Sequence, residues 1–462
     1  MEQLEILSKN DEQTVEEDTA KLDFQINTVN VMKFAIPTIV SMIAMSIFGT
    51  IDGIFVSRFL DVKSLSAVNI AMPILTATVA VGMMIATGGS ALTARKKGEG
   101  KEKEARENFS LLIVFSTILS AIVAFFCWLF LDELLIHVLG ADELILPLAR
   151  DYILPVVIGM PIALIGFVMS KFLIVDGKPT LAMITSSSGG IISAGLNYIL
   201  LGVLGLDIFW AGMGTTIGYL VPTIVGVIYF IFKKKEGLYF VRPKWDTKAV
   251  TGSFTSGVSE FITMFAWTIT STVMNNIVMN IGGFEGVAAV GIALGAQGIV
   301  TSIFVGYAFG IAPIVSYKHG KKNDEDIKKI YQLSMKIMTV LAILAIVMGV
   351  ILASPLTVIY VPRFTNVYNM SVAGIRLMSA SFVFVSFNTF ATAFFTAFED
   401  GWVSGMMAFM RSIVFIVATL LVIPGMLGTM TGVWIALPFA EVLAILVTIY
   451  YLKKMKKVYH YA

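Results

Sequence analysis

The chain repeats itself at one fixed offset, and both copies consist of long apolar segments. The residues Ala-Val-Asn-Ile-Ala at 67–71 return as Ala-Val-Gly-Ile-Ala at 289–293 (289 − 67 = 222). The same offset aligns Gly88 with Gly310 and Lys96 with Lys318 without a gap. A membrane protein that is built from two similar halves binds its cargo between them, and rocking of the halves exposes that site to alternate sides. The repeat therefore predicts a transporter rather than an enzyme or a receptor.

The composition places the chain in a lipid bilayer. Hydrophobic residues make up 57% of it and charged residues 14%, whereas a soluble domain carries about 25% charged residues. A spanning helix needs roughly 20 mostly apolar residues, because the hydrocarbon layer is about 30 Å thick. Twelve segments meet this length, at 32–57, 65–94, 109–131, 145–171, 180–204, 209–232, 250–280, 287–317, 331–360, 367–397, 402–424 and 428–452.

Lysine and arginine gather in every second connection between these segments, and again after residue 453. The positive-inside rule places such connections, and hence both termini, in the cytoplasm. Two halves that start on the same side have the same topology. We therefore expect an all-α integral protein of the plasma or inner membrane, with twelve transmembrane helices in two six-helix lobes that are related by a pseudo-twofold axis along the membrane normal. The expected parts are a disordered acidic tail (1–30), the first lobe (31–232), a cytoplasmic linker (233–249), the second lobe (250–452) and a basic cytoplasmic tail (453–462).

The sequence offers no cluster of groups for catalysis or metal binding. Its one cysteine, Cys127, lies in an apolar segment, so neither an internal disulfide nor a cysteine-rich metal site is possible. A membrane enzyme would need a nucleophile, a base or metal ligands gathered at the membrane face. We expect no enzyme activity, no cofactor and no nucleic-acid partner, and the internal repeat makes a monomer sufficient for transport.

Ionisable residues inside apolar spans are costly and are therefore candidates for function. Asp52, in the first span, has no cation within one helical turn, and a carboxyl group in such a place can take up and release a proton. Alternatively, it caps a polar network at the mouth of a wet cavity. Pro37 lies about four helical turns earlier (52 − 37 = 15) and removes one helical hydrogen bond. The first span could therefore bend when Asp52 changes its charge.

The seventh span carries a polar stripe that begins at Glu260. The stripe continues at steps of three or four residues, so its members share one helix face: Thr263, Trp267, Ser271 and Asn275. Such a face lines a cavity or contacts another helix, and the cost of exposing Glu260 to lipid favours the cavity. Gln297, in the eighth span, is a weaker candidate for the same cavity.

Two further charges, Arg411 and Glu441, lie near the middle of the eleventh and twelfth spans. One interpretation is that they form an ion pair between neighbouring helices. The alternative is that Glu441 contacts a cationic substrate. Arg376 lies nearer the outer end of the tenth span and could reach the interface. The same span contains several phenylalanines between 382 and 398 that suit either a promiscuous binding surface or contact with lipid.

Several local motifs resemble those of a known family. The first span reads Ile36-Pro37 and then Asp52-Gly53-Ile54-Phe55-Val56. The second contains Ala-Val-Asn-Ile-Ala-Met-Pro at 67–73 and ends in Gly-Gly-Ser-Ala at 88–91. Together with the repeat, these motifs resemble the multidrug and toxic compound extrusion family near its DinF and MepA branches, over about residues 30–455.

This resemblance implies a V-shaped pair of lobes that exchanges lipophilic, cationic organic compounds for H⁺ or Na⁺. In the DinF-like branch an aspartate that follows a proline at this same spacing couples the ion, and Asp52 matches it. Asn197 matches an asparagine that helps to hold the cation, but the aspartate common four residues later is Leu201 here. A hard cation needs several oxygen ligands, whereas a proton needs one carboxylate. We therefore expect H⁺ coupling, with Na⁺ coupling or the flipping of a lipid-linked precursor as alternatives.

Overall fold

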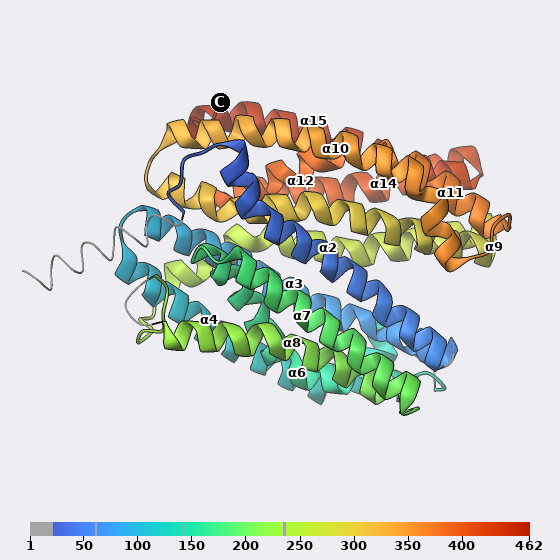
Figure 1. Cartoon of the computed structure of the whole chain (residues 1–462). Helices are drawn as coiled ribbons and strands as arrows, with labels where there is room; N and C mark the ends of the chain where they lie inside the picture. Colours follow the sequence, from blue (N-terminus) through green and yellow to red (C-terminus); the bar gives the residue numbers. More distant parts are fainter. Residues whose placement is uncertain (1–21, 61, 142, 234–236) are drawn as a thin grey trace, which may run out of the picture.

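The computed structural model describes residues 22–60, 62–141, 143–233 and 237–462, except for the side chains at 50, 52–54, 57, 62 and 65. Every regular element in these ranges is helical, and the helices form two bundles that lie side by side (Figure 1). The helices of the first bundle are α2 (Thr28–Phe59), α3 (Val62–Gly98), α4 (Glu102–Leu129), the short α5 (Leu131–Glu133) and η1 (Leu134–Val138), α6 (Leu146–Val175), α7 (Pro179–Asn197) with η2 (Tyr198–Val203), and α8 (Ile208–Phe232).

The second bundle has the same number of spans. Its helices are α9 (Thr247–Gly320), α10 (Asp324–Tyr360), α11 (Asn366–Ser379), α12 (Phe382–Ala397), α13 (Gly401–Phe409) with η3 (Met410–Phe415) and α14 (Ile416–Leu427), and α15 (Met430–Tyr459). We call the two bundles the N-lobe and the C-lobe.

The helix count agrees with the twelve predicted spans. In the described part of the chain, nine helices are long and apolar enough to cross a membrane, and ten if α11 and α12, which are bent by 56°, form one span. A straight helix with the 74 residues of α9 would be about 110 Å long. Gly283 instead adopts φ 59° and ψ −155°, which only glycine reaches easily, so α9 breaks there and supplies two spans. The twelfth is α7, which continues into η2.

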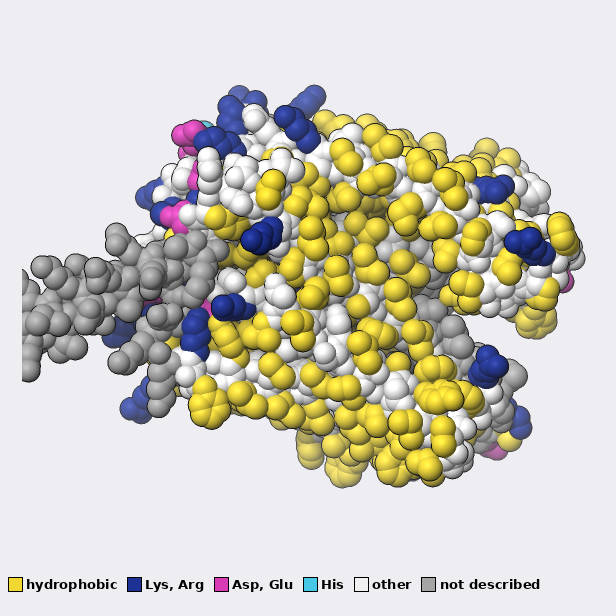
Figure 2. Space-filling view, viewed as in Figure 1, with side chains coloured by type: hydrophobic (Ala, Val, Ile, Leu, Met, Phe, Trp, Pro, Cys, Tyr) yellow, Lys and Arg dark blue, Asp and Glu magenta, His cyan; other side chains and the backbone are white. Residues whose placement is uncertain are grey.

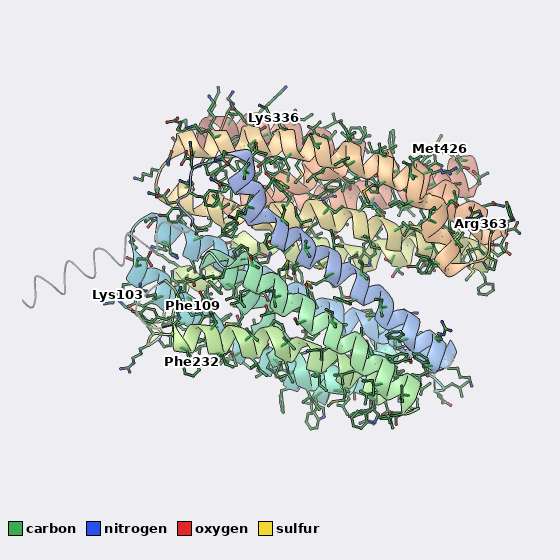
Figure 3. All side chains as sticks on the ribbon, viewed as in Figure 1. Lys103, Phe109, Phe232, Lys336, Arg363 and Met426 are labelled. Carbon is green, nitrogen blue, oxygen red and sulfur yellow. The ribbon has the colours of Figure 1, made fainter. Side chains whose placement is uncertain are left out.

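The charged residues mark one end of the molecule. Lysine and arginine gather at the end near both described termini, which we call the basic end, and a wide hydrophobic band separates it from the opposite end (Figure 2). Lys103 lies at the basic end, and Arg363 and Met426 lie at the opposite end (Figure 3). The band carries exposed apolar side chains such as Ile343 and Phe232. This arrangement suits a protein whose waist contacts lipid.

Residues that we expected in the two tails pack against the rest of the protein. Residues 1–21 lie outside the described part, but Leu22 is buried, and Asp23 forms ion pairs with Lys318 and Lys321 of the C-lobe. The boundary at residue 30 is therefore wrong, because residues 22–30 pack against the protein. The basic segment at 453–462 is mostly helical: α15 runs to Tyr459, and Tyr461 is buried among aromatic rings of α12.

The repeat is visible in equivalent contacts, first within each half and then between the two halves. Lys96 pairs with Glu104 at 2.7 Å, and their counterparts in the repeat, Lys318 and Asp326, pair at the same distance (318 − 96 = 222; 326 − 104 = 222). Across the interface, a Cβ on Gly98 would lie 2.0 Å from the carbonyl oxygen of Tyr317. In the same way, a Cβ on Gly320 would lie 2.1 Å from the carbonyl oxygen of Arg95. Such reciprocal contacts are those of a two-fold axis between the lobes.

The lobes touch backbone to backbone toward the basic end. A Cβ on Gly88 of α3 would lie 1.9 Å from the carbonyl oxygen of Ser253 of α9, and a Cβ on Gly257 would lie 1.9 Å from that of Met84. An ion pair between Arg95 and Glu399, at 2.8 Å, joins the same end. At the opposite end, Figure 2 shows a notch between the two lobes. The molecule is therefore closed at its basic end and parted at the other.

Candidate functional site

Two cavities meet at the interface between the lobes. The N-lobe cavity, of about 270 Å³, is lined by α2, α3, α6, α7 and α8 and by three residues of α9. The C-lobe cavity, of about 340 Å³, is lined by both halves of α9 and by α12, η3, α14 and α15. Met42, Val305 and Phe309 line both cavities. These three side chains form a thin wall between the two spaces.

The C-lobe cavity collects most of the candidates on the seventh and eighth spans. Glu260, Thr263 and Trp267 line it from the first half of α9, and Gln297 lines it from the second half. Glu260 is only 8% exposed, whereas Trp267 is half-exposed. Asn275 is exposed and is among the lining residues of neither cavity, so these cavities do not support its prediction as a cavity residue. The polar face follows the cavity for about two turns and then leaves it.

Arg411 and Glu441 meet on the wall of this cavity. The Arg411 Nε donates to both carboxylate oxygens of Glu441 at 3.0 Å, and Nη1 donates to the Thr389 hydroxyl at 3.0 Å. Asn388 donates to Glu441 at 2.8 Å and accepts from Thr448 at 2.7 Å. A buried carboxylate that is neutralised and hydrogen-bonded in this way is well satisfied. Of the two alternatives, the structure shows the ion pair between helices.

The N-lobe candidates are only partly described. The side chain of Asp52 lies outside the described residues, so its distance from Asn197 is not given. Asn197 is buried at the end of α7 against Gly214 of α8, where an added Cβ would lie 2.2 Å from its Oδ1. Leu201 is buried in the hydrophobic core of the same lobe, and it supplies no oxygen ligand there.

Pro37, which was also a candidate to line the cavity, lies at the crossing of α2 with α9 and is among the lining residues of neither cavity. Ala35 lies two residues before Pro37 and packs against Gly310 of the C-lobe, and Ile39 lies two residues after it and packs against Gly306. The helix bond that Pro37 removes is therefore lost where α2 touches the other lobe.

Most phenylalanines of the tenth span are buried in the protein, and none of these buried rings lines either cavity. Phe390, Phe394 and Phe395 are buried in the core of the C-lobe, and Phe394 packs on Tyr461 with ring centroids 5.2 Å apart. Arg376 is exposed in the last turn of α11 and lines neither cavity.

The sequence analysis missed Lys171. This side chain is 8% exposed, lines the N-lobe cavity, and holds its ammonium group 3.2 Å from the ring centroid of Phe309. The predicted span ended at Lys171, which made it look like a boundary cation, but α6 continues to Val175. The apolar run at 172–175 was the signal that could have placed Lys171 inside the helix.

Comparison with known proteins agrees with this geometry. The MatE family model matches the chain twice, at residues 37–199 and 260–422. The chain belongs to the MatE family. The spacing between the starts of the two matches (260 − 37 = 223) is one more than the offset seen in the sequence. The resemblance to the multidrug and toxic compound extrusion (MATE) family is thus confirmed, and the chain is a multi-span membrane transporter of the MepA-like type.

The relatives and solved structures match most of the chain. The multidrug export protein MepA of Staphylococcus saprophyticus is 23% identical over 423 residues, which cover 90% of this chain and 91% of that protein. MepA of Staphylococcus haemolyticus is 25% identical over 326 residues, 70% of this chain and 71% of its own length. A multidrug resistance MATE transporter in an outward-facing conformation matches with a TM-score of 0.87 at 19% identity, over 94% of this chain and 96% of its own.

Proposed function

We propose that this MATE transporter exports lipophilic, cationic organic compounds by alternating access, in antiport with H⁺. The C-lobe cavity carries this proposal. Glu260 lines it together with Trp267 and Phe309, and no lysine or arginine of the described chain lies within 4.0 Å of the Glu260 carboxylate. The other acid of this cavity, Glu441, is neutralised by Arg411. A carboxylate that shares a cavity with aromatic side chains and lies outside any such ion pair suits a lipophilic cation.

The orientation that we propose for the protein in the membrane follows from its basic end. The positive-inside rule places that end, with both termini, in the cytoplasm of a cell whose plasma or inner membrane holds the protein. The lobes then close toward the cytoplasm and part toward the outside, so the structure corresponds to an outward-facing state. One chain contains both lobes and both cavities, so we propose a working monomer.

The donor groups favour a proton over Na⁺. Leu201 adds no oxygen beside Asn197, and Glu441 is held by Arg411. We propose that Asp52 carries the proton, with Asn197 as its neighbour. An inward proton supplies about 1.4 kcal/mol per pH unit and roughly 2.3 kcal/mol per 100 mV.

The test is the efflux of a fluorescent lipophilic cation from proteoliposomes under an imposed pH gradient or Na⁺ gradient. We expect the pH gradient to drive efflux in the wild type and not in Asp52→Asn. Asp207→Asn is the matched control, because Asp207 is an exposed aspartate at the start of α8. We expect it to behave as the wild type.

Three outcomes would replace the proposal. Efflux that follows only the Na⁺ gradient would establish Na⁺ coupling. Unchanged efflux by a folded Asp52→Asn variant would place the coupling residue elsewhere. Movement of a lipid-linked phosphate compound without movement of the cation would establish a flippase, although the two cations lining the cavities, Lys171 and the paired Arg411, make a weak phosphate site.

A further inference from the structure

Lys171 and Glu260 lie on opposite sides of the wall between the two cavities. Lys171 lines the N-lobe cavity and Glu260 the C-lobe cavity, while Phe309 lines both. Lys171 and Glu260 are each 8% exposed, and the two charges interact electrostatically without forming an ion pair. The ammonium group of Lys171 instead lies over the Phe309 ring at 3.2 Å from its centroid. Lys171 is thus held on an aromatic face that also lines the cavity of Glu260.

We propose that Lys171 is an internal competitor, which expels the cationic cargo from Glu260 when the lobes close at the basic end. This inference rests on the proposed function, because it concerns the same cargo and the same carboxylate. It assigns Lys171 a part in cargo release that the family match does not give it.

The position of Lys171 makes its effect depend on conformation. Lys171 belongs to α6 of the N-lobe, four residues before the helix ends at the basic end (175 − 171 = 4), whereas Phe309 and Glu260 belong to α9 of the C-lobe. The backbone contacts at Gly88 and Gly257 hold the two lobes together toward this end. Rocking that opens the basic end must therefore draw Lys171 away from Glu260.

The charges then favour binding in one state and release in the other. With Lys171 nearby, Lys171 and Glu260 sum to zero, and a bound monovalent cation leaves the site with an uncompensated positive charge. With Lys171 withdrawn, the same cation neutralises Glu260. The carboxylate therefore accepts cargo while the basic end is open and rejects it after that end has closed. Since cargo release limits turnover in many transport and enzyme cycles, Lys171 raises the rate of export.

The experiment measures binding of tetraphenylphosphonium, a permanent monocation, to the purified full-length protein. Removal of one nearby positive charge should tighten binding by about tenfold or more, so Lys171→Met should bind more tightly than the wild type and turn over more slowly in proteoliposomes. Lys171→Arg keeps the charge and should bind as the wild type does. In a Glu260→Gln background the carboxylate for which Lys171 and the cation compete is absent, so Lys171→Met should tighten binding clearly less than it does when Glu260 is present.

A second variant covers the case in which Lys171→Met does not fold. Phe309→Leu removes the ring that holds the ammonium group and leaves Lys171 free to reach Glu260, so it should weaken cation binding. Equal or weaker binding by folded Lys171→Met, or unchanged binding by Phe309→Leu, would overturn the inference. A wild type that neither binds nor exports the cation would instead overturn the proposed function.

Discussion

Replacement of Gly257 by alanine should weaken the closure of the lobes at the basic end. The Cβ of an alanine would lie 1.9 Å from the carbonyl oxygen of Met84 and 2.7 Å from its carbonyl carbon. Both atoms belong to the backbone of α3, so no side-chain rotation relieves the contact. Since an ordinary carbon–oxygen contact is about 3.3 Å or longer, α9 and α3 must move apart by more than about 1 Å.

The size of the effect follows from the cost of overpacking. An extra methyl group in a well-packed contact costs about 1–3 kcal/mol. If only the closed state makes this contact, the ratio of closed to open molecules falls by about 5- to 150-fold. Gly252→Ala is the matched control, because Gly252 lies in the same helix with nothing within 4 Å of its added Cβ. That change should leave the equilibrium unaltered and stabilise the helix by about 0.5–1 kcal/mol.

The assay is the distance between two spin labels at the basic end, one on each lobe. Lys103 of α4 and Lys328 of α10 are exposed and can be replaced by cysteine once the native Cys127 is changed to serine. Gly257→Ala should lengthen the distances and slow export, whereas Gly252→Ala should change neither. Equal distance distributions in all three proteins would refute the reasoning that this glycine contact closes the lobes.

Two further predictions concern buried charges. Arg411→Met leaves Glu441 buried without its cation, so it should lower the free energy of unfolding by about 3–5 kcal/mol. The double variant Arg411→Met/Glu441→Met should recover most of this stability in thermal unfolding. Equal melting temperatures for the single variant and the wild type would contradict the prediction. Burial raises the pKa of Glu399, in the turn between α12 and α13, from 4.5 to about 7, although Arg95 opposes the shift. Because the folded state then binds more protons than the unfolded state, the wild type should lose stability relative to Glu399→Gln as the pH rises from 4.5 to about 7. If the melting temperatures of the wild type and Glu399→Gln change in parallel with pH across that range, the raised pKa of Glu399 is contradicted.

Features that depend on local pattern could be predicted from the sequence. Helical periodicity and loop charge are local, and they led to the twelve spans and their orientation; the internal repeat led to the two lobes, and the resemblance of local motifs led to the family. The stripe that begins at Glu260 was also readable, because residues three or four apart share a helix face. Its extent was not, since the point at which the cavity ends depends on the neighbouring helices, and Asn275 lies beyond that point.

Features that depend on packing between distant segments could not be predicted. The Phe309 ring that holds Lys171 is far from it along the chain (309 − 171 = 138) and belongs to the other lobe. The Phe394 ring packs on Tyr461, which the sequence assigned to the basic cytoplasmic tail. Periodicity along one helix cannot distinguish a phenylalanine that faces lipid from one that a distant segment covers.

Proton counterflow tests the central claim most directly. Proteoliposomes that contain the wild type and an internal pH dye are prepared at equal pH on both sides, and a lipophilic cation is added to the outside without Na⁺. Antiport predicts that entry of the cation drives protons outward, so the interior becomes alkaline, and that Asp52→Asn abolishes this signal. Cation entry without a change in internal pH would contradict the account.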